Sequence, residues 1–317
     1  MPPAEEPTSG DARLLSAART LALDVVAGEL ARSFERAGIR CILLKGPAMA
    51  RWLYDDESYR AYVDIDFLVP RTDLGAATKL LSQAGFELSL LESALPHGRR
   101  PHAGTWIRPG DGANVDLHDT LPGIGVSPGE VWGALEQDTE RLVVGRAELD
   151  VLAEPARALL VVLHAAHHGV KDEQALTDLS HALVRLSEST WREASALASR
   201  LDAVPAFVSG LNLAPDGSLL AAALELPDAS TVETRLRASS APELALSFDW
   251  LVRAPSFRVR TRLVWRRLAP PAGVMKARSS LARRGSVGLV AAYVLNPVRL
   301  AWQAAPALRA WLSAQRR

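Results

Sequence analysis

The stretch YRAYVDIDFLV, residues 59–69, decides the fold of the N-terminal half, because it places two carboxylates within an apolar run that predicts a strand over 61–69. Side chains along a strand alternate between its two faces, so Asp64 and Asp66 share one face. The opposite face is predicted to carry the intervening apolar residues: Val63, Ile65 and Phe67. Two carboxylates this close repel each other, and burying them unpaired is costly. The pattern therefore predicts a cation beside this pair.

The flanking sequence predicts further strands separated by helices. Residues 11–37 have the apolar spacing of a helix that ends at Gly38, and CILLK at 41–45 is a short apolar strand. Gly46-Pro47 then opens a helix over 47–54, since proline is favoured in the first turn. The remaining predicted elements are a helix at 73–84, a polar loop at 92–101, and strands at 86–91, 103–108, 113–119, 140–144 and 147–152.

The apolar pattern becomes exclusively helical after Glu154-Pro155. We therefore expect a domain boundary near residue 153. Residues 1–153 are predicted to form an α/β domain of the α+β type with a mixed sheet, and residues 154–317 an all-helical domain.

Composition favours a cytoplasmic globular protein. Hydrophobic residues make up 48% of the 317 residues and charged residues 23%. The polar, acidic start MPPAEEPTSGD resembles neither a secretory signal nor a transit peptide, and the single Cys41 suits a reducing compartment. No apolar run reaches the roughly 18–20 residues that span a bilayer, so we expect no membrane span.

The zero net charge hides an asymmetry. Residues 253–317 contain fourteen Arg and Lys and no Asp or Glu, whereas the preceding residues contain 22 basic and 36 acidic residues. The basic segment could attract phosphate-rich partners, or it could neutralise the acidic remainder of the chain. The second interpretation is the more ordinary one, and the sequence leaves both open.

The residues that suggest chemistry are Lys45-Gly46, the Asp64 and Asp66 pair, and Asp116 on a later predicted strand. Carboxylate oxygens are ligands that Mg²⁺ prefers, and two such ions stabilise both the attacking and the leaving oxygen of a phosphoryl transfer. A glycine at a helix entrance exposes N–H groups to an anion, and an adjacent lysine adds positive charge. Each element alone is commonplace. Together, and in this order, they favour metal-dependent phosphoryl transfer.

The same motifs resemble a known family. Residues 43–88 (LLKGPAMARW…GFEL), Val115-Asp116-Leu117-His118, LLVVLHAAHHG at 159–169 and LTDLSHAL at 176–183 are similar to the bacterial family labelled "uncharacterised nucleotidyltransferase". That family is a branch of the DNA polymerase beta-like nucleotidyltransferase superfamily. The resemblance covers most of the chain and implies a nucleotidyltransferase-fold domain followed by a helical domain.

The resemblance also implies an activity, which is the Mg²⁺-dependent transfer of a nucleoside monophosphate from an NTP such as ATP to an acceptor. Asp64, Asp66 and Asp116 would hold two Mg²⁺ ions, with Mn²⁺ as an alternative, and Asp116 would assist deprotonation of the acceptor. Lys45 and Gly46 would hold the triphosphate. The superfamily's usual Gly-Ser is Gly46-Pro47 here, so a phosphate-contacting hydroxyl is missing, and Lys45 is expected to compensate.

Other candidates are accessory. Arg60 could contact phosphate or be exposed without a role, and His118 could transfer protons or pack beneath the site. Three histidines share one helix face at i, i+3 and i+4: His164, His167 and His168. A zinc site would need a further ligand, and the His-Glu-x-x-His pattern is absent. We therefore expect a structural or hydrogen-bonding role for these histidines, with Asp178 as one partner.

Three functions compete at this stage. The first is nucleotidyl transfer to a small molecule, a peptide or tRNA. The second is a glycosyltransferase that uses a nucleotide-sugar in the same site, and the third is an inactive nucleotide-binding module. The intact carboxylates disfavour the third, and the basic segment lacks the regularly spaced aromatics that stack on bases. No motif identifies the acceptor, the preferred nucleotide or the oligomeric state.

Overall fold

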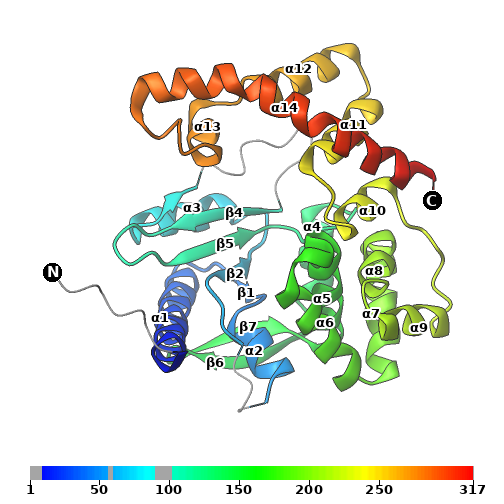
Figure 1. Cartoon of the computed structure of the whole chain (residues 1–317). Coiled ribbons are helices and arrows are strands. Elements are labelled where there is room, and N and C mark those ends of the chain that lie inside the picture. The colour runs from blue at the N-terminus through cyan, green and yellow to red at the C-terminus, as the bar shows by residue number, and fades with distance from the viewer. Residues whose placement is uncertain (1–8, 56–59, 90–101, 317) are drawn as a thin grey trace. The chain divides into compact units, whose positions relative to one another are not determined.

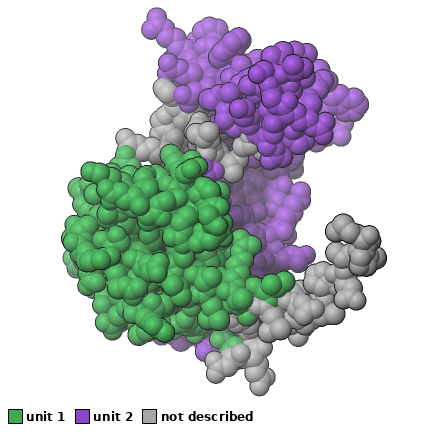
Figure 2. All heavy atoms as spheres, turned by 90° about the vertical axis from the view of Figure 1, so that its left-hand side faces the viewer, with its two compact units in different colours: residues 1–88, 103–121, 126–157 green, residues 89–102, 122–125, 158–317 purple. Residues whose placement is uncertain are grey.

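The computed structural model describes residues 9–55, 60–89 and 102–316 (Figure 1). The chain divides into two compact units, shown in green and purple in Figure 2. The sheet unit comprises residues 1–88, 103–121 and 126–157, and the helical unit comprises 89–102, 122–125 and 158–317. The predicted loop at 92–101 lies outside the described residues, and the domain boundary near residue 153 stays a prediction.

The sheet unit is built on a mixed seven-stranded sheet in the order β3-β4-β5-β2-β1-β7-β6. The pairs β2–β5 and β1–β7 are parallel, and the other neighbours are antiparallel. The mixed sheet predicted from the sequence is therefore confirmed. Its strands are β1 (Ile42–Leu43), β2 (Ile65–Leu68), β3 (Glu87–Leu88), β4 (Ala103–Ile107), β5 (Asn114–His118), β6 (Thr139–Val144) and β7 (Ala147–Leu152).

Four helices accompany these strands: α1 (Ser9–Arg36), α2 (Pro47–Leu53), α3 (Leu74–Gln83) and α4 (Pro128–Leu135). The sequence analysis missed α4, although its start carries a clear signal. Ser127 and Glu130 form a capping box in which each side chain satisfies a backbone N–H of the other, and Pro128 occupies the first turn.

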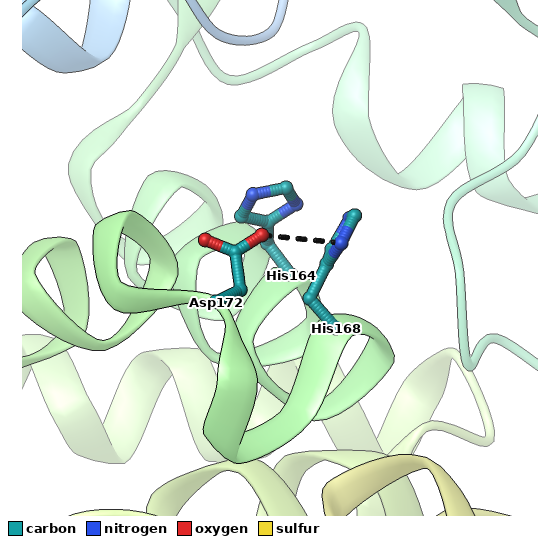
Figure 3. A group of neighbouring side chains, drawn as sticks. All are labelled: His164, His168 and Asp172. Atoms are coloured by element: carbon teal, nitrogen blue, oxygen red, sulfur yellow. Dashed lines mark ion pairs between the residues drawn. The ribbon is translucent and has the colours of Figure 1, made fainter. Parts of the chain in front are cut away.

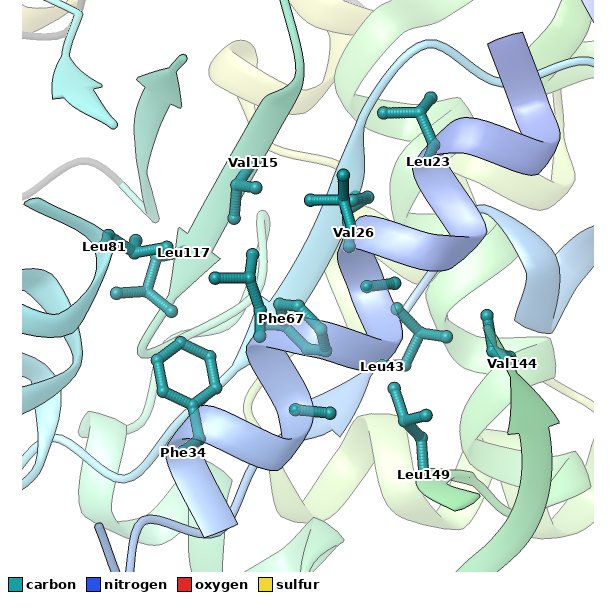
Figure 4. Close-up of a cluster of buried hydrophobic side chains, with 14 of the residues drawn as sticks. Leu23, Val26, Phe34, Leu43, Phe67, Leu81, Val115, Leu117, Val144 and Leu149 are labelled. Atoms are coloured by element: carbon teal, nitrogen blue, oxygen red, sulfur yellow. The ribbon is translucent and has the colours of Figure 1, made fainter. Parts of the chain in front are cut away.

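Helices α1 and α3 contribute to a buried core on one face of the sheet (Figure 4). Phe34 of α1 meets Phe67 of β2 edge-on with ring centroids 5.8 Å apart, and Leu81 of α3 belongs to the same cluster. Ile65 and Phe67 thus face the core, as predicted. Val63 does not, because β2 begins only at Ile65 and the Val63 side chain is 55% exposed.

The described part of the helical unit contains no strand, in agreement with the predicted all-helical region. Helix α5 (Glu154–His168) enters it from the sheet unit, and η2 (Gly169–Lys171), a single 3₁₀ turn, follows. The later helices are α6 (Glu173–Arg185), α7 (Glu188–Arg200), α8 (Val204–Leu211), α9 (Pro215–Ala223), α10 (Val232–Ala238), α11 (Glu243–Arg253), α12 (Phe257–Leu268), α13 (Ala272–Arg278) and α14 (Gly285–Arg316). Among the described residues, no helix has both the length and the apolar character needed to cross a bilayer.

Candidate active site

Strands β2 and β5 bring two of the predicted carboxylates together. The strands are parallel, and their register places Asp66 directly beside Asp116 and Leu68 beside His118. Because the alternate residues of both strands face the core under α1 and α3, these polar side chains share the other face. One ligand atom from each of Asp66, Asp116 and His118 lies within 4.8 Å of the others.

Asp66 is the most enclosed member of this group, with no exposed surface. Its Oδ1 lies 2.7 Å from Lys45 Nζ and 3.0 Å from His118 Nε2, which donates to it. Burial alone would raise the pKa of Asp66, but Lys45 and His118 outweigh that effect and hold the pKa well below its usual range. Conversely, burial would lower the pKa of Lys45, and Asp66 more than offsets this, so the pKa of Lys45 is raised. The structure therefore pairs the predicted triphosphate ligand Lys45 with Asp66.

The remaining oxygens of the two carboxylates fit a divalent cation. Asp66 Oδ2 and Asp116 Oδ1 are buried, and no described residue donates a hydrogen bond to either. Buried carboxylate oxygens without donors are costly, and they occur chiefly where an ion or an ordered water completes the site. Hard oxygen donors converging from two adjacent strands are the ligand set that Mg²⁺ takes.

Asp64 lies just before β2 and shares the electrostatic environment of these groups. Burial, together with the negative charges of Asp66 and Asp116, raises the pKa of Asp64 to about 6. Lys45 and Arg60 act in the opposite direction without cancelling the shift. Arg60 is only 8% exposed, so the alternative that its side chain lies at the surface is wrong, and its contact with phosphate stays a prediction.

Gly46 shapes the turn that carries Lys45 to this site. Its φ of 63° and ψ of −122° are hard for other residues to adopt, and Pro47 then opens α2. Leu44 N donates to Asp66 O at 2.9 Å, which fixes the turn against β2. Helix α2 is seven residues long and lacks one N–H at Pro47, so its contribution to anion binding is small compared with that of Lys45.

The accessory candidates His164, His168 and Asp178 lie in the helical unit. His164 and His168 on α5 gather with Asp172, as Figure 3 shows, and His168 Nδ1 is 3.2 Å from Asp172 Oδ2. Asp178 is buried on α6 and accepts a hydrogen bond from Gln174 Nε2 at 2.9 Å. Asp172, which the sequence analysis did not consider, therefore pairs with His168, and the expected partnership of Asp178 with the histidines stays a prediction. The spacing of Asp172, four residues beyond His168, was the available signal.

Three solved structures match part of this chain at low sequence identity. The antibiotic-resistance factor ANT(2'')-Ia is 15% identical, with a TM-score of 0.40 over 59% of this chain and 95% of that chain. The lincosamide antibiotic adenylyltransferase LnuA, bound to lincomycin, is 14% identical, with a TM-score of 0.33 over 48% of this chain and 90% of that one. An antigenic nucleotidyltransferase-like protein from Paracoccidioides brasiliensis is 16% identical, with a TM-score of 0.37 over 67% and 95%.

A search of the curated proteins finds no match. A family model described as "Uncharacterised nucleotidyltransferase" matches residues 10–216, a range that includes the carboxylates on β2 and β5 as well as the histidines of α5. Since this match covers more than half of the 317 residues, the chain belongs to the uncharacterised nucleotidyltransferase family.

Proposed function

We propose that this protein transfers a nucleoside monophosphate from an NTP to an acceptor hydroxyl or phosphate. The observation that carries the proposal is the pair Asp66 and Asp116 on adjacent strands, because their buried oxygens Asp66 Oδ2 and Asp116 Oδ1 receive no hydrogen bond from any described residue. Because the chain belongs to a nucleotidyltransferase family, we assign nucleotidyl transfer to this pair of carboxylates. Asp64, Asp66 and Asp116 would hold two Mg²⁺ ions, and Mn²⁺ would serve as a substitute.

The bound ions would supply Lewis-acid stabilisation of the attacking and leaving oxygens. The chain's own residues do the rest. Asp116 would accept the proton of the acceptor hydroxyl, and His118 Nε2 would hold Asp66 in a fixed orientation by donating to its Oδ1. The Lys45 ammonium pairs with Asp66, and with a cation held at that carboxylate it would instead offset negative charge on the triphosphate. Arg60 adds positive charge beside Asp64.

The acceptor is a small molecule, a peptide or tRNA in this proposal. Its identity depends on surfaces that the carboxylate site does not define.

The test is isothermal titration of each NTP into the full chain, with and without Mg²⁺. Wild type is compared with Asp64→Asn/Asp66→Asn, with Asp116→Asn, and with the matched control Glu87→Gln/Glu148→Gln, whose two carboxylates are exposed on β3 and β7. We expect Mg²⁺-dependent NTP binding in wild type and control and its loss in both site variants. Asp116→Asn matters because it leaves the Lys45–Asp66 pair in place.

A folded wild type that binds no NTP in the presence of Mg²⁺ would overturn the proposal. Nucleotide-sugars would then be titrated in the same way, since the glycosyltransferase alternative requires a metal-held diphosphate at the same carboxylates. Where NTP binding is found, release of pyrophosphate on addition of candidate acceptors identifies the reaction.

A further inference from the structure

We propose that His164, His168 and Asp172 of the helical unit form a second metal site, which binds a first-row transition metal ion such as Zn²⁺ and differs in kind from the carboxylate site. One ligand atom from each side chain lies within 4.8 Å of the others, and Figure 3 shows the three side chains gathered at the end of α5. The histidine rings have centroids 4.4 Å apart. His168 and Asp172 are 44% and 31% exposed, so an ion can reach them.

Sequence spacing explains why the three groups meet. Positions 164 and 168 are one turn apart on α5 and therefore share a face. The helix ends at His168, and Gly169 turns the chain with a φ of 73° so that Asp172 returns to the same point. Only glycine fits here, because a Cβ at this position would lie 2.2 Å from Arg237 O of α10.

The turn is also held in place by Ser240, two residues after the end of α10. Ser240 Oγ donates to His168 O at 3.1 Å and accepts from Lys171 N at 3.2 Å. These bonds fix the backbone between two of the proposed ligands. A site whose backbone is already ordered loses little freedom when an ion binds.

The two carboxylate oxygens of Asp172 have separate partners. Oδ1 accepts a hydrogen bond from Ala175 N at 3.0 Å and caps α6, while Oδ2 faces His168 Nδ1 at 3.2 Å. The cap therefore holds the carboxylate so that its other oxygen points at the imidazoles. Such supporting hydrogen bonds orient the ligands of metal sites in proteins.

The chemistry of the donor set selects the ion. Two imidazoles and one carboxylate suit Zn²⁺, Fe²⁺, Co²⁺ or Ni²⁺, whereas Mg²⁺ prefers oxygen ligands alone. Three protein ligands leave at least one coordination position for water or another ligand. The neighbouring His167 has a different partner, since its Nδ1 lies 3.3 Å from Arg237 Nη1, and Arg237 is paired with Glu233.

The test is titration of Zn²⁺, followed by calorimetry, into the full chain carrying Asp116→Asn, which leaves the Lys45–Asp66 pair in place. This background weakens the alternative cluster of Asp66, Asp116 and His118 and separates the result from that of the proposed function. We expect one equivalent of Zn²⁺ to bind, with affinity reduced at least about tenfold by His164→Gln, His168→Gln or Asp172→Asn. Asparagine caps helices as well as aspartate does, so Asp172→Asn removes the charge without removing the cap.

The matched control is His181→Gln, which alters a histidine of α6 outside the cluster. It should bind Zn²⁺ like its parent. As a second readout, Co²⁺ should give intense visible absorption in the parent that is lost in His164→Gln. The proposal is overturned if the parent binds no Zn²⁺, if folded variants of the three residues bind as tightly as the parent, or if His181→Gln weakens binding equally. Circular dichroism confirms that each variant is folded.

Discussion

Asp64 is the residue whose protonation should most affect the stability of the metal-free protein. Its pKa in the folded state is about 6, against an ordinary value of 3.8. Between these two values the folded chain retains a proton that the unfolded chain has released. Stability therefore falls as pH rises through this window, because the folded state is the one that binds more protons. The ionised Asp64 carboxylate thus carries an energetic cost at neutral pH in the metal-free protein.

Asp64→Asn should remove this cost. We expect the variant to exceed wild type in unfolding free energy at pH 7 by on the order of 2 kcal/mol, and the difference to disappear near pH 4. Urea denaturation in EDTA at pH 4, 5, 6 and 7 measures both proteins, with Glu87→Gln as a control at an exposed carboxylate. A variant that is less stable than wild type at pH 7, or a difference independent of pH, would contradict the assignment.

Lys45 and Asp66 should behave as a coupled pair. Removing one partner leaves the other charge buried without its counterion, so Lys45→Met or Asp66→Asn should each destabilise the fold by about 3–5 kcal/mol. The double variant should lose clearly less than the sum of the two, because neither charge is then left alone. Chemical denaturation at neutral pH gives the coupling energy. Strict additivity would mean that the 2.7 Å contact contributes little.

At the scale of elements, the turn between β6 and β7 depends on glycine. Gly145 has a φ of 56°, and a Cβ there would lie 2.0 Å from Asp24 O of α1. Gly28 of α1 approaches the same turn, since its Cβ would lie 2.6 Å from Gly145 O. The hairpin and the helix thus meet backbone to backbone, which only small residues allow.

Gly145→Ala should therefore destabilise the protein by about 3 kcal/mol or more, because it combines backbone strain with an overlap that a packed backbone cannot relieve. Gly133→Ala on α4 is the matched control. Nothing lies within 4 Å of its would-be Cβ, so alanine should stabilise the helix by roughly 0.5–1 kcal/mol. Thermal and urea unfolding compare the two variants. Equal effects of the two substitutions would show that the contact with α1 is unimportant.

Local patterns in the sequence predicted most helices and strands of the sheet unit, because strand alternation and helical spacing are properties of neighbouring residues. The same locality explains what was missed. Helix α4 is short and was passed over despite its capping box at Ser127. The pairing of Lys45 with Asp66 depends on how β1 and β2 align, and the return of Asp172 to His168 depends on the turn at Gly169. Alignment and turn geometry follow from packing, which the sequence does not display.

At the scale of the whole molecule, the basic segment of residues 253–317 can be examined for the ion pairs that its arginines form within the helical unit. Carboxylates of that unit form ion pairs with Arg253, Arg267 and Arg278 of the basic segment. On α12, Arg258, Arg260 and Arg262 are exposed, and no described carboxylate of the unit forms an ion pair with them. Within this unit, ion pairs with carboxylates therefore neutralise only part of the positive charge of the basic segment. This favours the second interpretation of the segment, in which its arginines attract a polyanion.

This distinction leads to a prediction about the acceptor class. If the exposed arginines of α12 contact a polyanion such as tRNA, binding should weaken steeply as salt rises, because each neutralised phosphate releases counterions. Arg258→Gln/Arg260→Gln/Arg262→Gln should then reduce the slope of log affinity against log salt by about 2, since each contact with a single strand contributes roughly 0.7. Fluorescence anisotropy of labelled tRNA between low and physiological salt measures the slope.

The control for this experiment exchanges three exposed arginines outside the basic segment, Arg141, Arg146 and Arg192, for glutamine. This control removes the same total charge as the α12 variant. A reduced slope of log affinity against log salt in the α12 variant alone would therefore indicate a local contact, and not the effect of net charge on long-range attraction. Equal slopes in the two triple variants would mean that net charge alone governs binding. A wild type that binds tRNA weakly and without salt dependence would exclude a polyanionic acceptor and direct the search to small molecules and peptides.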